Sequence, residues 1–380
     1  MGGSTGPGGD GGGGAGGTGG VSGTSGSGLS GSTGEGGTAS QAGGGGTAAD
    51  AGPDADDGGT DAEPQPTLRS VASISGRFFG AALNAAHLAE SDYAAVASTE
   101  LSFATPENEM KWASTEPTRG TFSFDRGDAI TAFAAQNSIL VKGHTLVWHN
   151  QLPSWVPAIQ DATDLHDAMI SHITQVVSHY RGQVVAWDVV NEAVADSGQS
   201  LLRNTIFYQY LGAGYVDDAF NAAHAADPDA RLYYNDYGAE GMNQKSDAVY
   251  SLVQGMLSRG VPINGVGLEM HTSPTAASPS ATDIGKNMKR LADLGLDVLI
   301  SEMDVQICAS DLVAQSTRFH DIVAQCVAQP GCKAVTVWGV PDKYSWLNGQ
   351  ACATPHPLLF DDDYVAKPAY MAVMDAFLGR

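Results

Sequence analysis

Short apolar runs alternate with longer amphipathic stretches along most of the chain. From Phe79 onward, runs rich in Val, Ile, Leu and Phe are each followed by a polar loop and a helical pattern, and eight such units can be counted. Most runs lack alternation of polar and apolar residues, which is typical of strands buried on both faces. The predicted strands are Phe79–Leu83, Leu101–Thr105, Leu140–His144, Val184–Val190, Arg231–Asp236, Gly265–His271, Val298–Met303 and Ala334–Gly339.

The intervening helices are clearest in two places. Leu165–Tyr180 carries apolar residues near helical spacing, and Ile284–Leu294 follows Ser280 and Asp283, which have capping-box spacing. Alternation of strand and helix predicts a parallel sheet, and eight units favour closure into a (β/α)8 TIM barrel. An open, doubly wound sheet is the alternative that this pattern leaves.

The first 66 residues differ sharply from the rest in composition. They hold 27 of the 48 glycines and contain no aromatic residue, Lys or Arg. Such a tract cannot offset the conformational entropy lost on ordering, so we expect 1–66 to be a disordered linker. Residues 67–380 are expected to form one barrel domain, a length that single (β/α)8 barrels reach. We also expect that the numbering begins inside a longer precursor, past a signal, an anchor or another module.

The charge balance excludes several partners. The net charge is −23, and the part after the linker carries about −15, from 34 acids and 19 bases. Nucleic acid and anionic membrane are poor partners for such a surface, whereas a neutral substrate suits it. No stretch approaches the roughly 20 apolar residues that span a bilayer, so no membrane insertion is expected.

Four cysteines lie near the end of the chain: Cys308, Cys326, Cys332 and Cys352. An even, clustered set of cysteines suits disulfides in an oxidising compartment. We therefore expect a secreted or extracellular protein. A tether through a missing upstream segment is one option. Their spacing matches no metal site. Free buried thiols in a cytosolic enzyme are the alternative.

Polar residues end several of the predicted strands, where a barrel places its reactive groups. Carboxylates, imidazoles, amides and indoles follow the second, third, fourth, sixth, seventh and eighth strands. This mixture suits a sugar, whose hydroxyls need hydrogen-bond partners and whose ring faces stack on tryptophan.

Two glutamates, Glu192 and Glu302, close the fourth and seventh strands and are expected to face each other across the barrel mouth. Retaining glycoside hydrolysis needs two carboxyl groups about 5–5.5 Å apart. We assign Glu192 as acid/base and Glu302 as nucleophile. Asn191 can hold the sugar 2-hydroxyl, and His271 with Asp304 can form a relay that orients Glu302.

Six ordered motifs identify a resemblance to the endo-β-1,4-xylanases of glycoside hydrolase family 10, over roughly Phe79 to Leu378. The motifs are TPENEMKW at Thr105–Trp112, GHTLVWH at Gly143–His149, WDVVNE at Trp187–Glu192, YNDY at Tyr234–Tyr237, VWG at Val337–Gly339 and DKYSW at Asp342–Trp346. The resemblance implies a retaining xylanase that acts on xylan of the plant cell wall and needs no cofactor and no metal. We also expect the protein to be a monomer.

The same resemblance implies substrate-binding roles for further residues. On the glycone side these are Asn84, Glu107, Asn108, Lys111, Gln151 and Trp346. Around the attacked sugar they are His144, Trp148, Asn191, His271 and Trp338, and Tyr237 stacks on the leaving-group side. The resemblance also implies a Cys326–Cys332 disulfide, with Cys308–Cys352 as the expected second pair.

Three positions depart from the family pattern. Glu269 stands where the family usually has glutamine, and we expect it to be protonated or hydrogen-bonded in imitation of the amide. Leu347 replaces a frequent arginine and Gly238 a common asparagine, which leaves the substrate preference beyond the attacked sugar open.

Asp188 is expected to brace the barrel rim, with a minor influence on the charge of the site as its alternative. Six histidines on predicted helices or loops away from the strand ends are expected to be structural: His166, His172, His179, His224, His320 and His356.

Three other functions are weighed against a xylanase. Action on β-1,4-glucan requires Trp338 and Trp346 to accommodate a 6-hydroxymethyl group. A catalytically dead barrel that only binds polysaccharide conflicts with the presence of both glutamates and their supporting groups. A metal-dependent hydrolase needs three ligands on one open ion, and no His-X-His pair follows the first strand.

Overall fold

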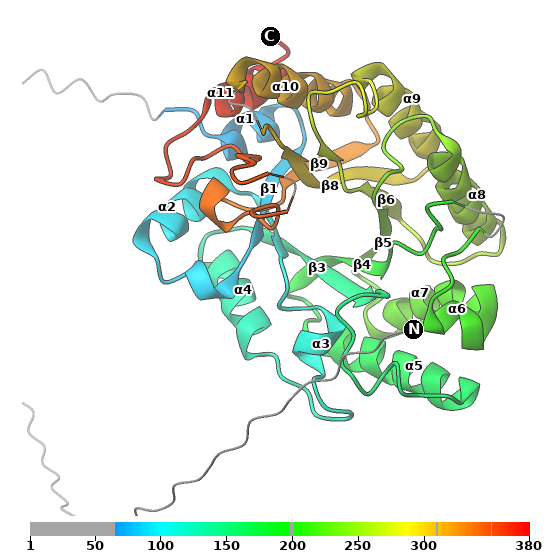
Figure 1. Ribbon diagram of the computed structural model, residues 1–380. Helices are drawn as coiled ribbons and strands as arrows, with labels where there is room; N and C mark the ends of the chain where they lie inside the picture. The colour runs from blue at the N-terminus through cyan, green and yellow to red at the C-terminus, as the bar shows by residue number, and fades with distance from the viewer. Residues whose placement is uncertain (1–64, 198–200, 309–310, 351) are drawn as a thin grey trace, which may run out of the picture. The chain divides into compact units, whose positions relative to one another are not determined.

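The computed structural model describes residues 65–197, 201–308, 311–350 and 352–380. The tract 1–66 that is predicted to be disordered lies outside the described residues, except for its last two. In the described part, eight parallel strands follow the order β6-β5-β4-β3-β2-β1-β9-β8, and β8 pairs back onto β6, which closes the ring (Figure 1). The predicted (β/α)8 barrel is therefore confirmed, and the open sheet is wrong.

The strands agree closely with the apolar runs of the sequence. Their bounds are β1 Phe78–Leu83, β2 Phe103–Pro106, β3 Leu140–Val147, β4 Val184–Asn191, β5 Arg231–Asp236, β6 Gly265–Leu268, β7 His271–Thr272, β8 Asp297–Val305 and β9 Cys332–Val337. One prediction is wrong, because the expected strand Gly265–His271 is divided. Met270 has a left-handed backbone (φ 68°), which separates β6 from the two-residue β7 that pairs with β8.

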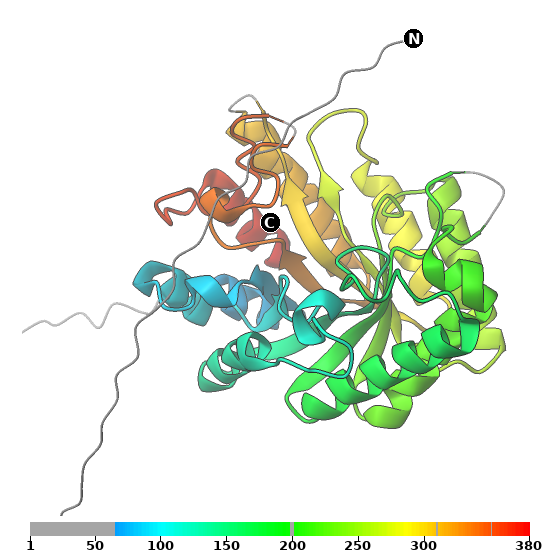
Figure 2. The ribbon, with the colours of Figure 1, turned by 60° about the horizontal axis from the view of Figure 1, so that its bottom comes forward.

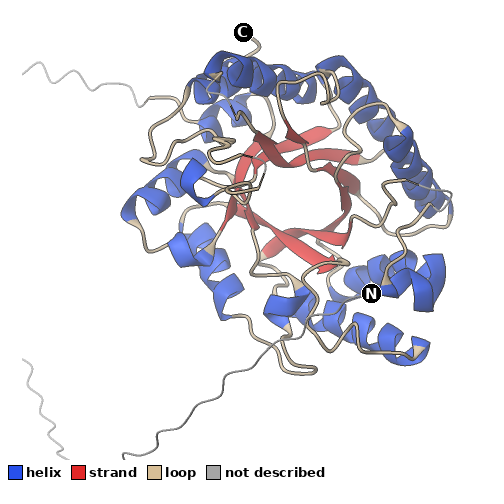
Figure 3. Cartoon of the chain, in the orientation of Figure 1, coloured by secondary structure: helices blue, strands red, loops and turns tan. Residues whose placement is uncertain are grey.

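Helices follow the strands and cover the outside of the ring (Figures 2 and 3). Their bounds are α1 Leu68–Ile74, α2 Ser91–Glu100, α3 Trp112–Thr115, α4 Asp125–Gln136, α5 Ala162–His179, α6 Ile206–Leu211, α7 Tyr215–Ala226, α8 Gln244–Ser258, α9 Ala281–Ala292, α10 Leu312–Ala328 and α11 Pro368–Phe377, with short 3-10 helices at Ala85–His87, Gly212–Gly214 and Asp342–Tyr344. Both predicted helices are present. Ser280 caps α9 by accepting a hydrogen bond from the Asp283 amide.

The main core lies between the strands and the helices. From α5, Leu165, Met169 and Ile173 are fully buried against it, as their helical spacing predicts. Close packing leaves no room for a side chain at Gly143, where a Cβ would lie 2.2 Å from the ring of Trp187. A separate buried cluster takes one residue from each of five strands and fills the barrel: Phe103, Ala186, Tyr233, Leu299 and Ala334.

Two disulfides join segments near the end of the chain. Cys326 of α10 is bonded to Cys332 of β9, and Cys308 after β8 is bonded to Cys352 in the loop that follows β9. The second bond connects two loops at the carboxyl ends of neighbouring strands. Among the described residues, no helix combines the length and the apolar character that a bilayer span requires.

Candidate active site

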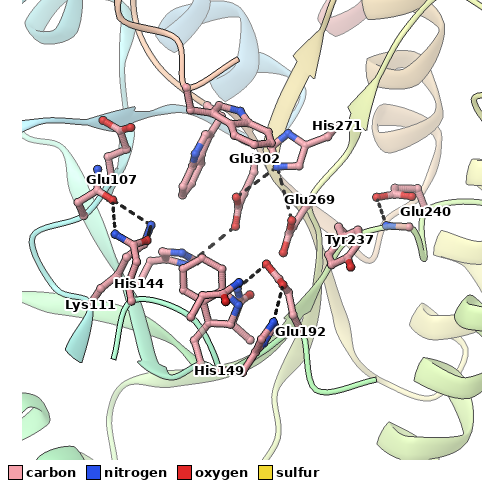
Figure 4. A pocket seen from close by; sticks show the side chains of 18 residues that line it. Glu107, Lys111, His144, His149, Glu192, Tyr237, Glu240, Glu269, His271 and Glu302 are labelled. Atoms are coloured by element: carbon pink, nitrogen blue, oxygen red, sulfur yellow. Dashed lines mark hydrogen bonds and ion pairs between the residues drawn. The ribbon is translucent and has the colours of Figure 1, made fainter. Parts of the chain in front are cut away.

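A cleft of about 580 Å³ opens at the carboxyl ends of the strands. Fourteen of the sixteen predicted catalytic and substrate-binding residues line it; the exceptions are Asn84 and Asp304, which contact residues of the lining. Figure 4 shows the carboxyl groups of Glu192, Glu269 and Glu302 pointing toward one shared space. The cleft therefore brings together groups from strands that are far apart in sequence.

Glu302 is held on β8 by partners from three other strands. Its carboxylate accepts a hydrogen bond from Asn235 Nδ2 (2.8 Å) and lies 3.5 Å from His271 Nε2 and 3.9 Å from His144 Nδ1. Burial alone opposes the charged form, but the positive charges of His144 and His271 outweigh burial and lower the pKa of Glu302 to about 2. Glu302 is therefore ionised across the usual working range of pH, as a nucleophile must be.

Glu192 follows β4, and its pKa is shifted in the opposite direction from that of Glu302. Its Oε1 accepts a hydrogen bond from Asn191 Nδ2 (3.3 Å), and His149 Nε2 lies 4.0 Å from its Oε2. Burial raises its pKa to about 7, and the negative charges of Asp236 and Glu302 act in the same direction. Glu192 therefore keeps a proton below about pH 7, which suits a general acid.

The backbone of Glu192 is left-handed (φ 54°), a conformation that costs a non-glycine residue of the order of 1–2 kcal/mol. The structure retains it because β4 ends at Asn191 and the Glu192 amide donates to the Asn235 carbonyl of β5 (2.9 Å). Strained backbone of this kind is often found at functional residues.

His271 connects the acids on the other side of the cleft. Its Nδ1 lies 2.8 Å from Asp304 Oδ2, and its Nε2 lies 3.5 Å from both Glu302 Oε2 and Glu269 Oε2. Burial by itself favours the neutral ring, but Asp304 and the two glutamates raise the pKa of His271 well above its ordinary value. A protonated imidazole donates to both sides, so the relay expected from the sequence is present as a set of contacts. Trp346 Nε1 donates to the same Asp304 oxygen (2.9 Å).

Glu269 is the third carboxyl group of the cleft and is almost fully buried (3% exposed). Burial, together with the charge of Glu302, raises its pKa well above the ordinary range. This direction agrees with the protonated, amide-like Glu269 that we expect from the sequence. Its Oε1 lies 3.2 Å from Asn235 Nδ2, the contact through which it joins the other acids.

Glu269, His271 and Glu302 also form a possible metal-binding group, because one ligand atom from each lies within 4.8 Å of the other two. A metal requires a free imidazole nitrogen. The raised pKa of His271 and its contact with Asp304 favour instead a ring that carries protons on both nitrogens. Among the described residues, His271 is hydrogen-bonded to Asp304 and lies beside both carboxyl groups.

Asn235 is a central residue that the sequence reasoning missed. Its Nδ2 lies 2.8 Å from Asn191 Oδ1 and from Glu302 Oε1, and its Oδ1 accepts from Ser301 Oγ (2.6 Å). It belongs to the YNDY motif, which is the signal that could have revealed it. The cleft is also lined by four residues outside the predicted set: His149, Asn150, Gly238 and Glu240.

One buried nitrogen near Glu192, His149 Nδ1, has no hydrogen-bond partner among the described residues. Buried polar atoms without a partner are rare in folded proteins.

Asp188 supports the cleft from beneath. It is fully buried, forms an ion pair with Lys142, and lies 2.9 Å from His144 Nδ1 through Oδ2. Burial lowers the pKa of His144, whereas its hydrogen bond to Asp188 and the charge of Glu302 act in the opposite direction. The position thus combines the bracing role predicted for Asp188 with an influence on the site.

A polar network lines the wall formed by the loops after β2 and β3. Lys111 Nζ donates to Asn108 Oδ1 (3.1 Å) and Gln151 Oε1 (2.7 Å), and lies 5.0 Å from the centre of the Trp148 ring. Burial lowers the pKa of Lys111. Asn84 does not line the cleft, but it donates a hydrogen bond to Glu107 Oε2 (3.1 Å), which does.

Tyr237 lines the opposite wall among charged groups. Its hydroxyl donates to Asp196 Oδ2 (2.7 Å) and accepts from Arg203 (3.0 Å), and Lys245 Nζ lies 3.5 Å from the centre of its ring. These contacts fix the ring and leave it able to stack on a sugar. Each of the six histidines predicted to be structural lies outside the lining of the cleft; His172, for example, stacks on Trp112 and contacts Glu116.

The fold and the site together define a class of protein: a (β/α)8 barrel that holds two glutamates of opposite protonation in one sugar-sized cleft, as glycoside hydrolases do. Residues 67–376 match glycosyl hydrolase family 10. The chain belongs to this family and is a glycoside hydrolase.

Relatives and solved structures agree with this assignment. Endo-1,4-beta-xylanase B of Thermotoga neapolitana is 39% identical over 289 residues, covering 74% of this chain and 82% of the relative. The endo-1,4-beta-xylanase of Agaricus bisporus is 36% identical, covering 82% and 94%. Native xylanase 10B from Thermotoga maritima superposes with a TM-score of 0.79 at 38% identity, covering 83% and 98%. Xylanase 10B from Thermotoga petrophila, in complex with xylobiose, gives the same values.

Proposed function

We propose that the protein is a retaining endo-β-1,4-xylanase that cleaves internal bonds of xylan through a covalent glycosyl-enzyme intermediate. The observation that carries the proposal is the opposite protonation of the two acids in one cleft, with a pKa of about 7 for Glu192 and about 2 for Glu302. The names of the relatives point to the same substrate.

In the first half of the reaction, Glu302 attacks the anomeric carbon while Glu192 transfers its proton to the leaving oxygen. The new ester removes the negative charge of Glu302, so the pKa of Glu192 falls. In the second half, Glu192 accepts a proton from water, which attacks the ester and releases the sugar with its original configuration. The order of events therefore follows from the negative charge of Glu302, which is lost when the ester forms and restored when the ester is hydrolysed.

The surrounding residues have positioning roles in this proposal. Asn191 holds the 2-hydroxyl of the attacked sugar, with His144, Trp148 and Trp338 around that ring, while Asp304 orients His271 beside the nucleophile. Tyr237 stacks on the leaving-group side. The glycone is bound by Asn84, Glu107, Asn108, Lys111, Gln151 and Trp346, and Glu269 in its protonated form replaces an amide.

The proposal also covers the compartment, the domain organisation and the oligomeric state of the enzyme. The two disulfides favour an oxidising compartment, so we place the enzyme outside the cytosol. Residues 67–380 form the catalytic domain, 1–66 a linker, and the enzyme works as a monomer.

Product analysis on xylan and on β-1,4-glucan tests the function directly. The expected result is rapid shortening of xylan, much slower action on glucan, and products that first appear in NMR spectra as β-anomers. First products in the α configuration contradict the retaining mechanism, and a preference for glucan overturns the substrate assignment. A Glu302→Ala variant that folds like the wild type and still cleaves xylan contradicts the assigned nucleophile.

A further inference from the structure

Arg203 connects the proposed acid/base with the wall of the cleft on the leaving-group side. It lies between β4 and α6, outside the lining of the cleft. Its Nε donates to the backbone carbonyl oxygen of Glu192 (3.1 Å), and its Nη2 donates to the Tyr237 hydroxyl (3.0 Å). One planar, rigid guanidinium therefore joins the residue that carries the proton to the ring that is expected to stack on the departing sugar.

The guanidinium of Arg203 is itself held by a carboxylate. Its Nη1 and Nη2 donate to the two oxygens of Asp196 (2.9 and 3.0 Å), the paired geometry that fixes an arginine most firmly. Asp196 also accepts hydrogen bonds from Lys245 Nζ (2.7 Å) and from the Tyr237 hydroxyl (2.7 Å). This network holds Arg203 in one orientation although its side chain is partly exposed.

The contact with Glu192 falls on strained backbone. Glu192 has a left-handed conformation (φ 54°), and its carbonyl oxygen accepts the hydrogen bond from Arg203. Its amide donates to the Asn235 carbonyl (2.9 Å), and the Arg203 amide donates to the carbonyl of the next residue, Ala193 (2.7 Å). Hydrogen bonds on both sides of Glu192 therefore offset the cost of this conformation, which sets the direction of the carboxyl group.

We propose that Arg203 is a positioning residue for the acid/base: it holds the Glu192 backbone so that the carboxyl faces the departing oxygen, and through Tyr237 it couples this position to the sugar on the leaving-group side. The inference rests on the proposed function and deepens it. Arg203 acts only through other residues, and a misplacement of a catalytic group by about 1 Å can cost a factor of about 100 in rate.

The test compares two xylobiosides that differ only in the leaving group, dinitrophenyl in one and unsubstituted phenyl in the other. Dinitrophenolate leaves without a proton, whereas the less stable phenolate benefits from one donated by Glu192. We expect Arg203→Met to lower kcat/KM about tenfold on the phenyl substrate and to leave kcat/KM on the dinitrophenyl substrate unchanged. An equal loss on both substrates overturns the proposal, because a merely structural role lowers both alike.

Azide tests the second half of the reaction in the same variant. Hydrolysis of the ester on Glu302 needs Glu192 as a base, so kcat on the dinitrophenyl substrate should fall. Azide attacks the anomeric carbon without a base, forms the glycosyl azide and releases the Glu302 carboxylate. Added azide is therefore expected to restore kcat of Arg203→Met, and a kcat that azide leaves unchanged contradicts the proposal.

The coupling through Tyr237 is tested with xylopentaose, which places a sugar on the leaving-group side. Tyr237→Phe keeps the ring and removes the hydroxyl that contacts Arg203. We expect this change to lower kcat/KM about threefold in the wild type and to have no further effect in Arg203→Met, since the two residues act as a unit. Losses that multiply in the double variant overturn the coupling.

Arg259 provides a matched control. It holds Asp217 of α7 by two hydrogen bonds, from Nε (2.6 Å) and Nη2 (2.9 Å), and lies after α8, outside the lining of the cleft. Arg259→Met should keep the wild-type ratio of kcat/KM on the two xylobiosides. A selective loss on the phenyl substrate in this variant overturns the proposal, because the effect then follows from the loss of any arginine–carboxylate pair.

The outcomes separate this inference from the proposed function. If the wild type leaves xylan intact, the proposed function fails. If the wild type cleaves xylan and both xylobiosides, but Arg203→Met shows neither the leaving-group selectivity nor the response to azide, only the role of Arg203 fails. Arg203→Lys repeats the test if the methionine variant misfolds, since lysine keeps the charge beside Asp196 but lacks the fork, and it should show the same selective loss.

Discussion

At the scale of single residues, Glu192 combines two features that oppose folding. Its left-handed backbone is costly for a residue with a Cβ, and its pKa is about 7 against an ordinary value of 4.5. A raised folded-state pKa stabilises the fold below pH 4.5, and this stabilisation is lost as the pH rises through 7. The ionised side chain is therefore a source of instability at neutral and alkaline pH.

The variant Glu192→Gln tests this cost. Glutamine imitates the protonated acid, so the free energy of unfolding of the variant, relative to wild type, should be higher at pH 8 than at pH 4 by about 3 kcal/mol. Urea unfolding at both pH values measures the difference. The exposed Asp362→Asn serves as control and should show no such dependence. Equal effects of Glu192→Gln at the two pH values contradict the raised pKa.

Glu269 is expected to influence the pH dependence of catalysis. In the wild type, kcat/KM should fall above about pH 7 as Glu192 loses its proton. Any charge that Glu269 gains as the pH rises repels the charge on Glu192 and so raises the pKa of Glu192. Glu269→Gln removes this repulsion, so the alkaline fall should move to lower pH while activity near pH 5 is retained.

Rates measured from pH 4 to pH 9 on the purified variant check this prediction. A profile that coincides with that of the wild type shows that Glu269 has no electrostatic role. In parallel, a 13C NMR titration of the side-chain carboxyl groups should show that Glu269 of the wild type is protonated at pH 6. A carboxylate signal at that pH contradicts the amide-like interpretation.

At the scale of elements, the strands could be predicted because both of their faces are buried and their sequences are therefore continuously apolar. The break between β6 and β7 could not, because the left-handed Met270 depends on the pairing of His271 and Thr272 with β8. The glutamates that end strands were visible as polar residues after apolar runs. Asn235 was not singled out, because its importance lies in contacts with Asn191 of β4, Glu302 of β8 and Glu269 after β6, which no local pattern contains.

The two disulfides are expected to contribute unequally to stability. Cys308–Cys352 closes a separation of 44 residues and Cys326–Cys332 one of 6. Loop-closure entropy predicts a loss of about 4 kcal/mol when the first is replaced by two serines and about 2 kcal/mol for the second. Denaturant unfolding of the two double variants measures both values. Because Trp346 precedes Cys352 in the same loop, the first variant should also raise KM for xylan, and an unchanged KM contradicts a role in holding that wall.

At the scale of the whole molecule, the negative charge is distributed over a protein whose proposed substrate is neutral. Long-range fields of this kind change encounter rates with charged partners and have little effect on neutral ones. We therefore expect kcat/KM on unbranched xylan to vary less than about twofold between 20 and 500 mM salt, a range that screens surface charges strongly. Initial rates at several salt concentrations check this, and a steep salt dependence contradicts a neutral substrate.

The shared amide of Asn235 has a consequence for engineering the enzyme. One small side chain contacts Asn191, Glu269 and Glu302, and Asn191 in turn contacts Glu192. Substitutions at these positions are therefore not independent, and their effects on rate and on acid tolerance will not add. Attempts to adapt the enzyme to another pH by changing one acid at a time will disturb the others, so libraries should vary the group together with its amide.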